Sequence, residues 1–234
     1  MSSLNILSGG AAQGLVGSLA PTFKAQTGFD IAGEFGAVGI MADKLRMGTP
    51  ADIVILTAAL VARLAEEKLV VAASIADVGL VETALAVRTG DAQVTVRDAA
   101  GLRDALLAAD EIFVPDIKAS TAGIHVAKVL DQLGIADRVA ARLRIFPNGA
   151  TAMRELAKSE ALRPIGCTQS TEIISTNGIT LSGSLPPGCE LATMYTAGIT
   201  TTAVHASQAQ HLIELLIGAG QRQQREHAGF LGAK

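Results

Sequence analysis

The chain has 234 residues and a formal net charge of −3, with 18% charged residues. This balance excludes the basic surface expected of a nucleic-acid-binding protein. Hydrophobic residues make up 49% and aromatic residues only 3%. Ala, Leu, Val and Ile must therefore pack a core large enough for one large domain or two smaller lobes.

Cysteine content and hydropathy exclude several further classes of protein. Cys167 and Cys189 lack zinc-binding spacing and are too few for a disulfide framework, so we expect buried thiols and no metal. No apolar run reaches 18 residues, which predicts no transmembrane helix. The start "MSSLNIL" shows none of the regions of a signal peptide. We expect a cytoplasmic protein, or a periplasmic one if a signal peptide was removed from this sequence.

The first part of the chain alternates short apolar runs with helical patterns, which favours an α/β architecture. The nearly all-apolar run "ADIVILT" is typical of a parallel strand that is covered on both faces. Pro21 is expected to disturb the middle of the first helix. The predicted strands are 4–7, 29–36 and 51–57, and the predicted helices are 12–28, 39–48 and 58–69.

The second part begins with a long predicted strand at 81–90 and ends with another at 191–200. Between them we predict strands at 111–116 and 163–171, a strand plus a turn over 179–188, a helix passing into a strand over 135–147, and helices within 94–110, at 120–134 and at 149–159. Two helices complete the chain. The two long strands predict that residues 83–195 form a second lobe inserted into a first lobe of residues 1–82 and 196–234. Ligands of such folds bind in the cleft between lobes.

Four turns from strand to helix share a small, polar or glycine-containing sequence: "SGGAA" (8–12), "GAVG" (36–39), "KASTAG" (118–123) and "NGAT" (148–151). Helix N-termini expose backbone N–H groups that attract anions, so four such turns around one cleft would bind a small anion. The alternative is that they are ordinary strand–helix connections. The predicted ligand-binding residues are Ser8, Gly9, Gly10, Ala11, Gly36, Ala37, Val38, Thr57, Lys118, Ser120, Thr121, Ala122, Asn148, Gly149, Thr168 and Gln169.

Individual residues carry both a chemical and a structural interpretation. Lys118 could pair with a carboxylate or be a solvated loop residue. His125 could be a general base or a hydrogen-bonded packing residue. Tyr195, the one tyrosine, could reach the cleft as a proton donor or pack in the core. Gln169 ends an apolar strand and needs a polar partner, for which a ligand is suitable. Lys118, His125 and Tyr195 are the catalytic candidates.

The sequence resembles the molybdate-binding protein family of type II periplasmic solute-binding proteins of ABC importers. The resemblance spans the chain, from "LNILSGGAAQGLVGSLAPTFKAQTG" through "GTPADIVILT" to "STAGIHVAKVLDQLGI". It implies a two-lobed α/β fold in which each lobe is a mostly parallel sheet flanked by helices. It further implies a monomer that binds a small anion without a cofactor, and a membrane permease as partner if the protein is exported.

The sequence departs from this family at the expected oxyanion ligands. The resemblance places two hydroxyl-bearing serines of the family at Ala11 and at Ala37 or Val38, and a tyrosine at Thr168 or Gln169. The lost hydrogen bonds favour a small di- or tricarboxylate over molybdate or tungstate. The combination of "SGGAA", Gln169 and "SGSLPP" is similar to aconitate isomerases, which shift an allylic proton without a cofactor. Two functions follow: carboxylate binding, with or without isomerisation, and anion delivery to an importer, including molybdate or tungstate.

Overall fold

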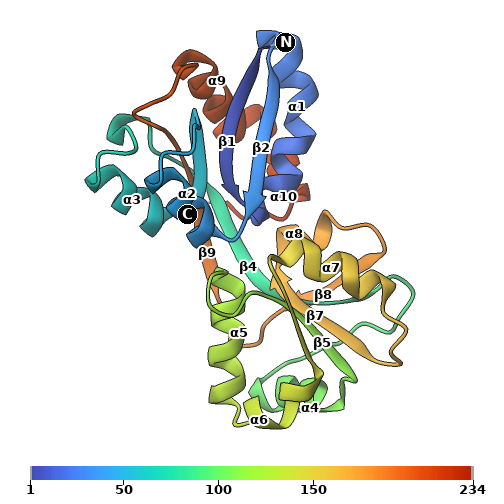
Figure 1. Cartoon of the computed structure of the whole chain (residues 1–234). Coiled ribbons are helices and arrows are strands. Elements are labelled where there is room, and N and C mark those ends of the chain that lie inside the picture. The colour runs from blue at the N-terminus through green and yellow to red at the C-terminus, as the bar shows by residue number, and fades with distance from the viewer. Residues whose placement is uncertain (1, 233–234) are drawn as a thin grey trace. The chain divides into compact units, whose positions relative to one another are not determined.

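The computed structural model describes residues 2–232. They form two compact units (Figure 1). The first contains the chain up to Val81 and from Thr193 onward, and the second is Glu82–Ala192. Strand β4 (Ala76–Arg88) leads out of the first unit and β9 (Ala192–Ile199) leads back. The predicted α/β class is confirmed.

The first unit has a parallel sheet in which β1 (Ser3–Gly9) lies between β2 (Asp30–Gly36) and β3 (Ile53–Thr57). Strand β9 pairs antiparallel with β3. The strands are followed by η1 (Gly10–Ala12) with α1 (Gln13–Thr27), by α2 (Val38–Arg46) and by α3 (Ala58–Glu66). The short η2 (Ala72–Ser74) precedes β4, and α9 (Ala206–Ile217), η4 (Ala219–Gln221) and α10 (Arg222–His227) follow β9. All three parallel strands thus lead into helices at one edge of the sheet.

The second unit has a sheet in which β7 (Pro164–Gln169), β5 (Glu111–Pro115) and β6 (Leu143–Phe146) are parallel. Strand β4 pairs antiparallel with β7 and with β8 (Ile179–Ser184). One face is covered by α4 (Ala99–Ala108) and α5 (Thr121–Gln132), and the other by α7 (Gly149–Lys158) and α8 (Ser170–Ile174). The short α6 (Ala136–Val139) and η3 (Ala140–Arg142) precede β6.

Two details of the predicted elements were wrong. Helix α1 continues through Pro21, whose exposed position lets water satisfy the carbonyl that loses its N–H partner. The predicted strand 163–171 ends at Gln169, because Ser170, Thr171 and Glu172 begin α8. Serine, threonine and acidic residues favour the first turn of a helix.

The stretch "GTPADIVI" has a structural explanation in Asp52, whose side chain is buried. Its Oδ2 accepts the N–H of Asn5, and its Oδ1 accepts the N–H groups of Val204 and His205, at 2.8–2.9 Å. One carboxylate therefore connects the start of β1 with the segment that follows β9. Charge-assisted bonds of this kind are among the stronger hydrogen bonds in proteins.

Candidate functional site

Most of the predicted site residues lie at the carboxyl edges of the two parallel sheets. In the first unit these are Ser8–Ala11, Gly36–Val38 and Thr57, at the ends of β1, β2 and β3. In the second unit they are Lys118–Ala122, Asn148–Gly149 and Thr168–Gln169, which follow β5, follow β6 and end β7. Each sheet edge therefore gathers several helix N-termini, the arrangement in which α/β proteins bind ligands.

At the carboxyl edge of the first unit's sheet, backbone N–H groups are the principal hydrogen-bond donors, because the side chains there offer few. Helix α2 begins after Ala37 and α1 after Ala12, and neither helix has a side-chain cap or an acidic residue in its first turn. Ser8 is completely buried, and its hydroxyl donates to the carbonyls of Gly9 and Ile55 at 2.9 and 3.3 Å. The hydroxyl proton of Ser8 is thus already donated to protein carbonyl groups, and anion recognition here would rely on backbone N–H groups.

Gly9 is required by close packing. A Cβ atom at this position would lie 2.7 Å from Cγ1 of Val38 and 2.9 Å from Cε1 of Tyr195. Tyr195 pairs with Thr57 across β3 and β9, is 2% exposed, and packs edge-on against Phe230. The tyrosine ring therefore supports the turn after β1 from inside the first unit.

Gln169 is the most unusual polar residue of the second unit. Its side chain is 3% exposed, and within residues 2–232 neither its amide nitrogen nor its amide oxygen has a hydrogen-bond partner. The hydroxyls of Thr83 and Thr171 are also buried without a partner. Leaving such groups unsatisfied costs about 1–3 kcal/mol each. Gln169 and Thr83 face each other across β7 and β4, which indicates that an additional molecule completes their hydrogen bonds.

Strand alternation places Gln169 on the same face as α5. Gln169 is directly opposite Thr83 in the β4–β7 ladder, two residues from the Cys167–Leu85 pair. Cys167 and Leu85 pack in the same hydrophobic cluster as Val126 of α5. Because alternate residues of a strand share a face, the Gln169 amide and the Thr83 hydroxyl lie on this face, at the edge where α5 begins.

The N-terminus of α5 is open. Ser120 is its N-cap residue but makes no capping bond with its side chain. The carboxylate of Asp116 accepts the N–H groups of Lys118 and Ala119 instead, at 2.7 and 2.9 Å. Within the described part of the chain, no acceptor reaches the N–H groups of Thr121, Ala122 or Gly123. These groups are suitable donors for an anion.

At the same sheet edge, the N-terminus of α7 lies against the carboxylate of Glu172, which was not among the predicted ligand-binding residues. Glu172 is 5% exposed, and its Oε2 accepts the hydroxyl of Thr168 at 2.6 Å. Burial raises the pKa of Glu172, whereas the Thr168 hydroxyl and the N–H groups of Ala150, Gln169 and Gly149 act to lower it. The sequence signal was weak because Glu172 only becomes buried through the unpredicted α8.

The three catalytic candidates lie in different environments. Lys118 is exposed in the loop before α5. The imidazole Nε2 of His125 lies 2.8 Å from the carbonyl oxygen of Cys189, so this nitrogen donates a hydrogen bond to that carbonyl. Tyr195 is buried in the first unit. Among residues 2–232, no three His, Cys, Asp or Glu side chains gather as metal ligands.

Comparisons with known proteins agree with this geometry. A family model described as bacterial extracellular solute-binding protein matches residues 4–231. An aconitate isomerase from Pseudomonas sp is 23% identical over 238 residues, covering 98% of this chain and 88% of that protein.

Solved structures are similar over nearly the whole chain. The periplasmic molybdate-binding protein of Azotobacter vinelandii has a TM-score of 0.82 at 18% identity, covering 99% of this chain and 100% of that one. The sulfate-binding protein SubI of Mycobacterium tuberculosis has a TM-score of 0.75 at 19% identity, covering 98% and 86%. These similarities confirm the predicted two-lobed periplasmic-binding-protein fold.

Proposed function

The chain belongs to the family of bacterial extracellular solute-binding proteins, and from this premise we propose that its ligand is a small organic di- or tricarboxylate. The observation that carries the proposal is the buried, unpartnered amide of Gln169. An amide presents two donors and one acceptor, which suits a carboxylate beside a hydroxyl or a second, protonated carboxyl group. The open N-terminus of α5 on the same face supplies further donors for the negative charge.

In the second unit, the proposed binding position is the sheet edge at the N-terminus of α5, beside Gln169. The first unit has a similar edge of its own, where the backbone N–H groups after β1 and β2 have no competing acidic residue in their first helical turns. Ala11, Ala37 and Val38 offer no hydroxyl to a tetrahedral oxyanion. The added apolar surface fits the carbon skeleton of an organic acid better than it fits molybdate.

A second candidate function is isomerisation of the bound acid, favoured by the similarity to aconitate isomerase over 98% of the chain. In such a reaction, a base removes a proton from the methylene carbon of an unsaturated acid. The electron pair delocalises over the allylic carbons, and a proton returns to the far carbon as the double bond moves. Lys118, His125 and Tyr195 remain the candidates for this base, and no redox partner is needed.

The experiment is a binding panel measured by calorimetry with citrate, cis-aconitate, trans-aconitate, molybdate, tungstate and sulfate. We expect carboxylates to bind the wild-type protein, and Gln169→Leu to weaken them by about 10- to 100-fold. The matched control is Gln223→Leu, since Gln223 is exposed on α10, and it should bind as the wild type does. Binding of molybdate or tungstate alone would contradict the proposal and favour an oxyanion receptor for an importer.

Isomerisation has a separate readout. Proton NMR of cis- and trans-aconitate in heavy water follows both interconversion and deuterium incorporation. A carboxylate receptor without catalysis would bind the acid and leave both signals unchanged, whereas an isomerase would interconvert them and exchange the methylene protons.

A further inference from the structure

The carboxylate of Glu172 lies at the N-terminus of α7, although the residue itself belongs to α8. The hydroxyl of Thr168 donates to it, and the N–H groups of Gly149, Ala150 and Gln169 are close enough to lower its pKa. Two of these donors belong to the first turn of α7. This donor set is the type that binds an external anion at a helix N-terminus.

All four N–H groups that open α7 therefore face an acceptor. The Glu172 carboxylate lies against Gly149, and the N–H groups of Gly149 and Ala150 act to lower its pKa. The side-chain oxygen of Asn148 accepts the N–H of Thr151 at 2.8 Å, and the Asn148 carbonyl accepts that of Ala152 at 3.0 Å. Among the residues that the structure describes, no acceptor reaches the N–H groups of the first three residues of α5, at the same sheet edge.

The packing at Gly149 is built around this carboxylate. A Cβ atom at position 149 would overlap Oε2 of Glu172 and Oγ1 of Thr168. The glycine thus leaves the space in which the carboxylate approaches the helix backbone. Thr168 and Gln169, which are adjacent in β7, point to opposite faces of the sheet. The N-terminus of α7, where Glu172 lies, and the N-terminus of α5 are therefore on opposite faces of this sheet edge.

We propose that Glu172 is a resident anion that occupies the α7 N-terminus and directs the ligand's charge to α5 and Gln169. The consequence for selectivity, which rests on the proposed carboxylate function, is that Glu172 disfavours compact dianions. A tetrahedral oxyanion has all its charge on one group, which feels the repulsion of this carboxylate in full wherever it binds along the sheet edge. An extended di- or tricarboxylate can place its charged groups farther away.

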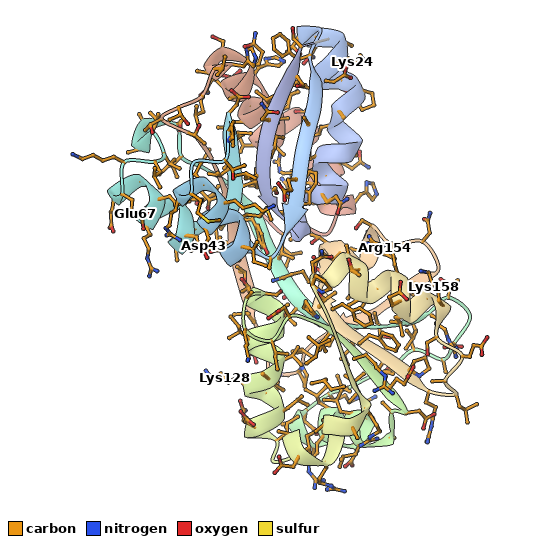
Figure 2. All side chains as sticks on the ribbon, viewed as in Figure 1. Lys24, Asp43, Glu67, Lys128, Arg154 and Lys158 are labelled. Atoms are coloured by element: carbon orange, nitrogen blue, oxygen red, sulfur yellow. The ribbon has the colours of Figure 1, made fainter. Side chains whose placement is uncertain are left out.

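Within residues 2–232, no basic side chain forms an ion pair with Glu172. Helices α7 and α8, with β7 and β8, form its surroundings. Figure 2 shows Arg154 and Lys158 on α7, and both are exposed. Lys158 pairs with Glu155 of the same helix. Strand β7 contributes only the Cys167 thiol as a titratable group, α8 contributes Glu172 alone, and β8 contributes none.

Chemical rescue tests the resident-anion assignment. Glu172→Ala removes the carboxylate and leaves its donors in place. At constant ionic strength, formate at about ten times its dissociation constant should raise the melting temperature of this variant by about 3 °C relative to chloride. The matched control is Glu155→Ala, which removes a half-buried glutamate from α7 that pairs with Lys158. Equal formate effects on the wild type and both variants would overturn the assignment.

An isosteric variant tests the selectivity if Glu172→Ala fails to fold. Glu172→Gln keeps an acceptor oxygen for the helix and removes the charge. We expect its affinity for sulfate and molybdate to rise at least about tenfold relative to its affinity for citrate. An unchanged ratio would overturn the selectivity claim. If neither the wild type nor Glu172→Gln binds any anion of the panel while formate still stabilises Glu172→Ala, the proposed function is wrong. The assignment of Glu172 as a resident anion would then still hold.

Discussion

Thr168 donates its hydroxyl proton to Oε2 of Glu172 over 2.6 Å, between two buried side chains of the second unit. The contact joins the end of β7 to α8 and holds the carboxylate against the first turn of α7. A buried carboxylate without a basic partner normally destabilises a protein, unless hydrogen bonds compensate for the lost hydration. Here the Thr168 hydroxyl and the nearby backbone N–H groups offset only part of this cost, because burial still raises the pKa of Glu172.

Gly149→Ala should destabilise the protein by about 1–3 kcal/mol, because the new methyl group overlaps Glu172 and Thr168. Urea unfolding measures this loss. The control is Gly17→Ala in α1, where a Cβ atom meets nothing within 4 Å, and which should stabilise the helix by about 0.5–1 kcal/mol. The cost at position 149 should shrink in a Glu172→Ala background, and equal costs in both backgrounds would contradict this account.

Glu172 should make stability depend on pH. Burial raises its pKa above the ordinary value of 4.5, so the folded protein holds the proton more tightly than the unfolded chain does. The resulting stabilisation is complete below pH 4.5 and is lost as the pH rises through the folded pKa. The stability of the wild type relative to Glu172→Gln should therefore decrease from acidic to neutral pH. Urea titrations across that range measure it, and a constant difference would contradict the raised pKa.

Both cysteine thiols should be unreactive in the native protein. Cys167 and Cys189 are free and buried, and burial raises the pKa of Cys167 to about 12. Because the thiolate is the reactive form, an aromatic disulfide reagent should label neither thiol until denaturant is added, after which it should label both. Rapid labelling of Cys167 without denaturant would show that its strand is accessible.

Gln169→Leu should leave the stability of the ligand-free protein unchanged or raise it by about 1 kcal/mol, because it removes two unsatisfied polar atoms. Thermal unfolding without ligand measures this effect. A substitution that weakens ligand binding while stabilising the fold is the signature of a residue kept for function. A loss of several kcal/mol would mean that Gln169 has a structural role.

The α/β architecture was predictable from sequence because periodicity reports burial directly. The all-apolar run ending at Thr57 and the small residues before each helix determine the strand–helix order. The start of α8 was missed because a helix of five residues is too short to show helical periodicity, although Ser170, Thr171 and Glu172 favour a first helical turn. The residues that contact Glu172 could not be predicted from the sequence either. They come from α7, β7 and α8, which only the fold brings together.

Some features of the candidate site could be predicted from the sequence, and others could not. Backbone donors at the helix starts after Ser120 and Ala37 could be inferred from local sequence, because small residues and glycines expose helix N-termini. Gln169 could be singled out because a polar group at the end of an apolar strand needs a partner. Whether a helix N-terminus is free to bind an anion, as in α5, or already faces an acceptor, as in α7, depends on Glu172. This distinction requires the three-dimensional structure.

The most direct test of the central claim is calorimetric titration of the wild-type protein with citrate, both aconitates, molybdate and sulfate, repeated with Gln169→Leu. The account predicts that at least one organic carboxylate binds more tightly than either oxyanion, and that this preference falls by about tenfold or more in the variant. Tight binding of molybdate or sulfate, unaffected by the loss of the Gln169 amide, would contradict it.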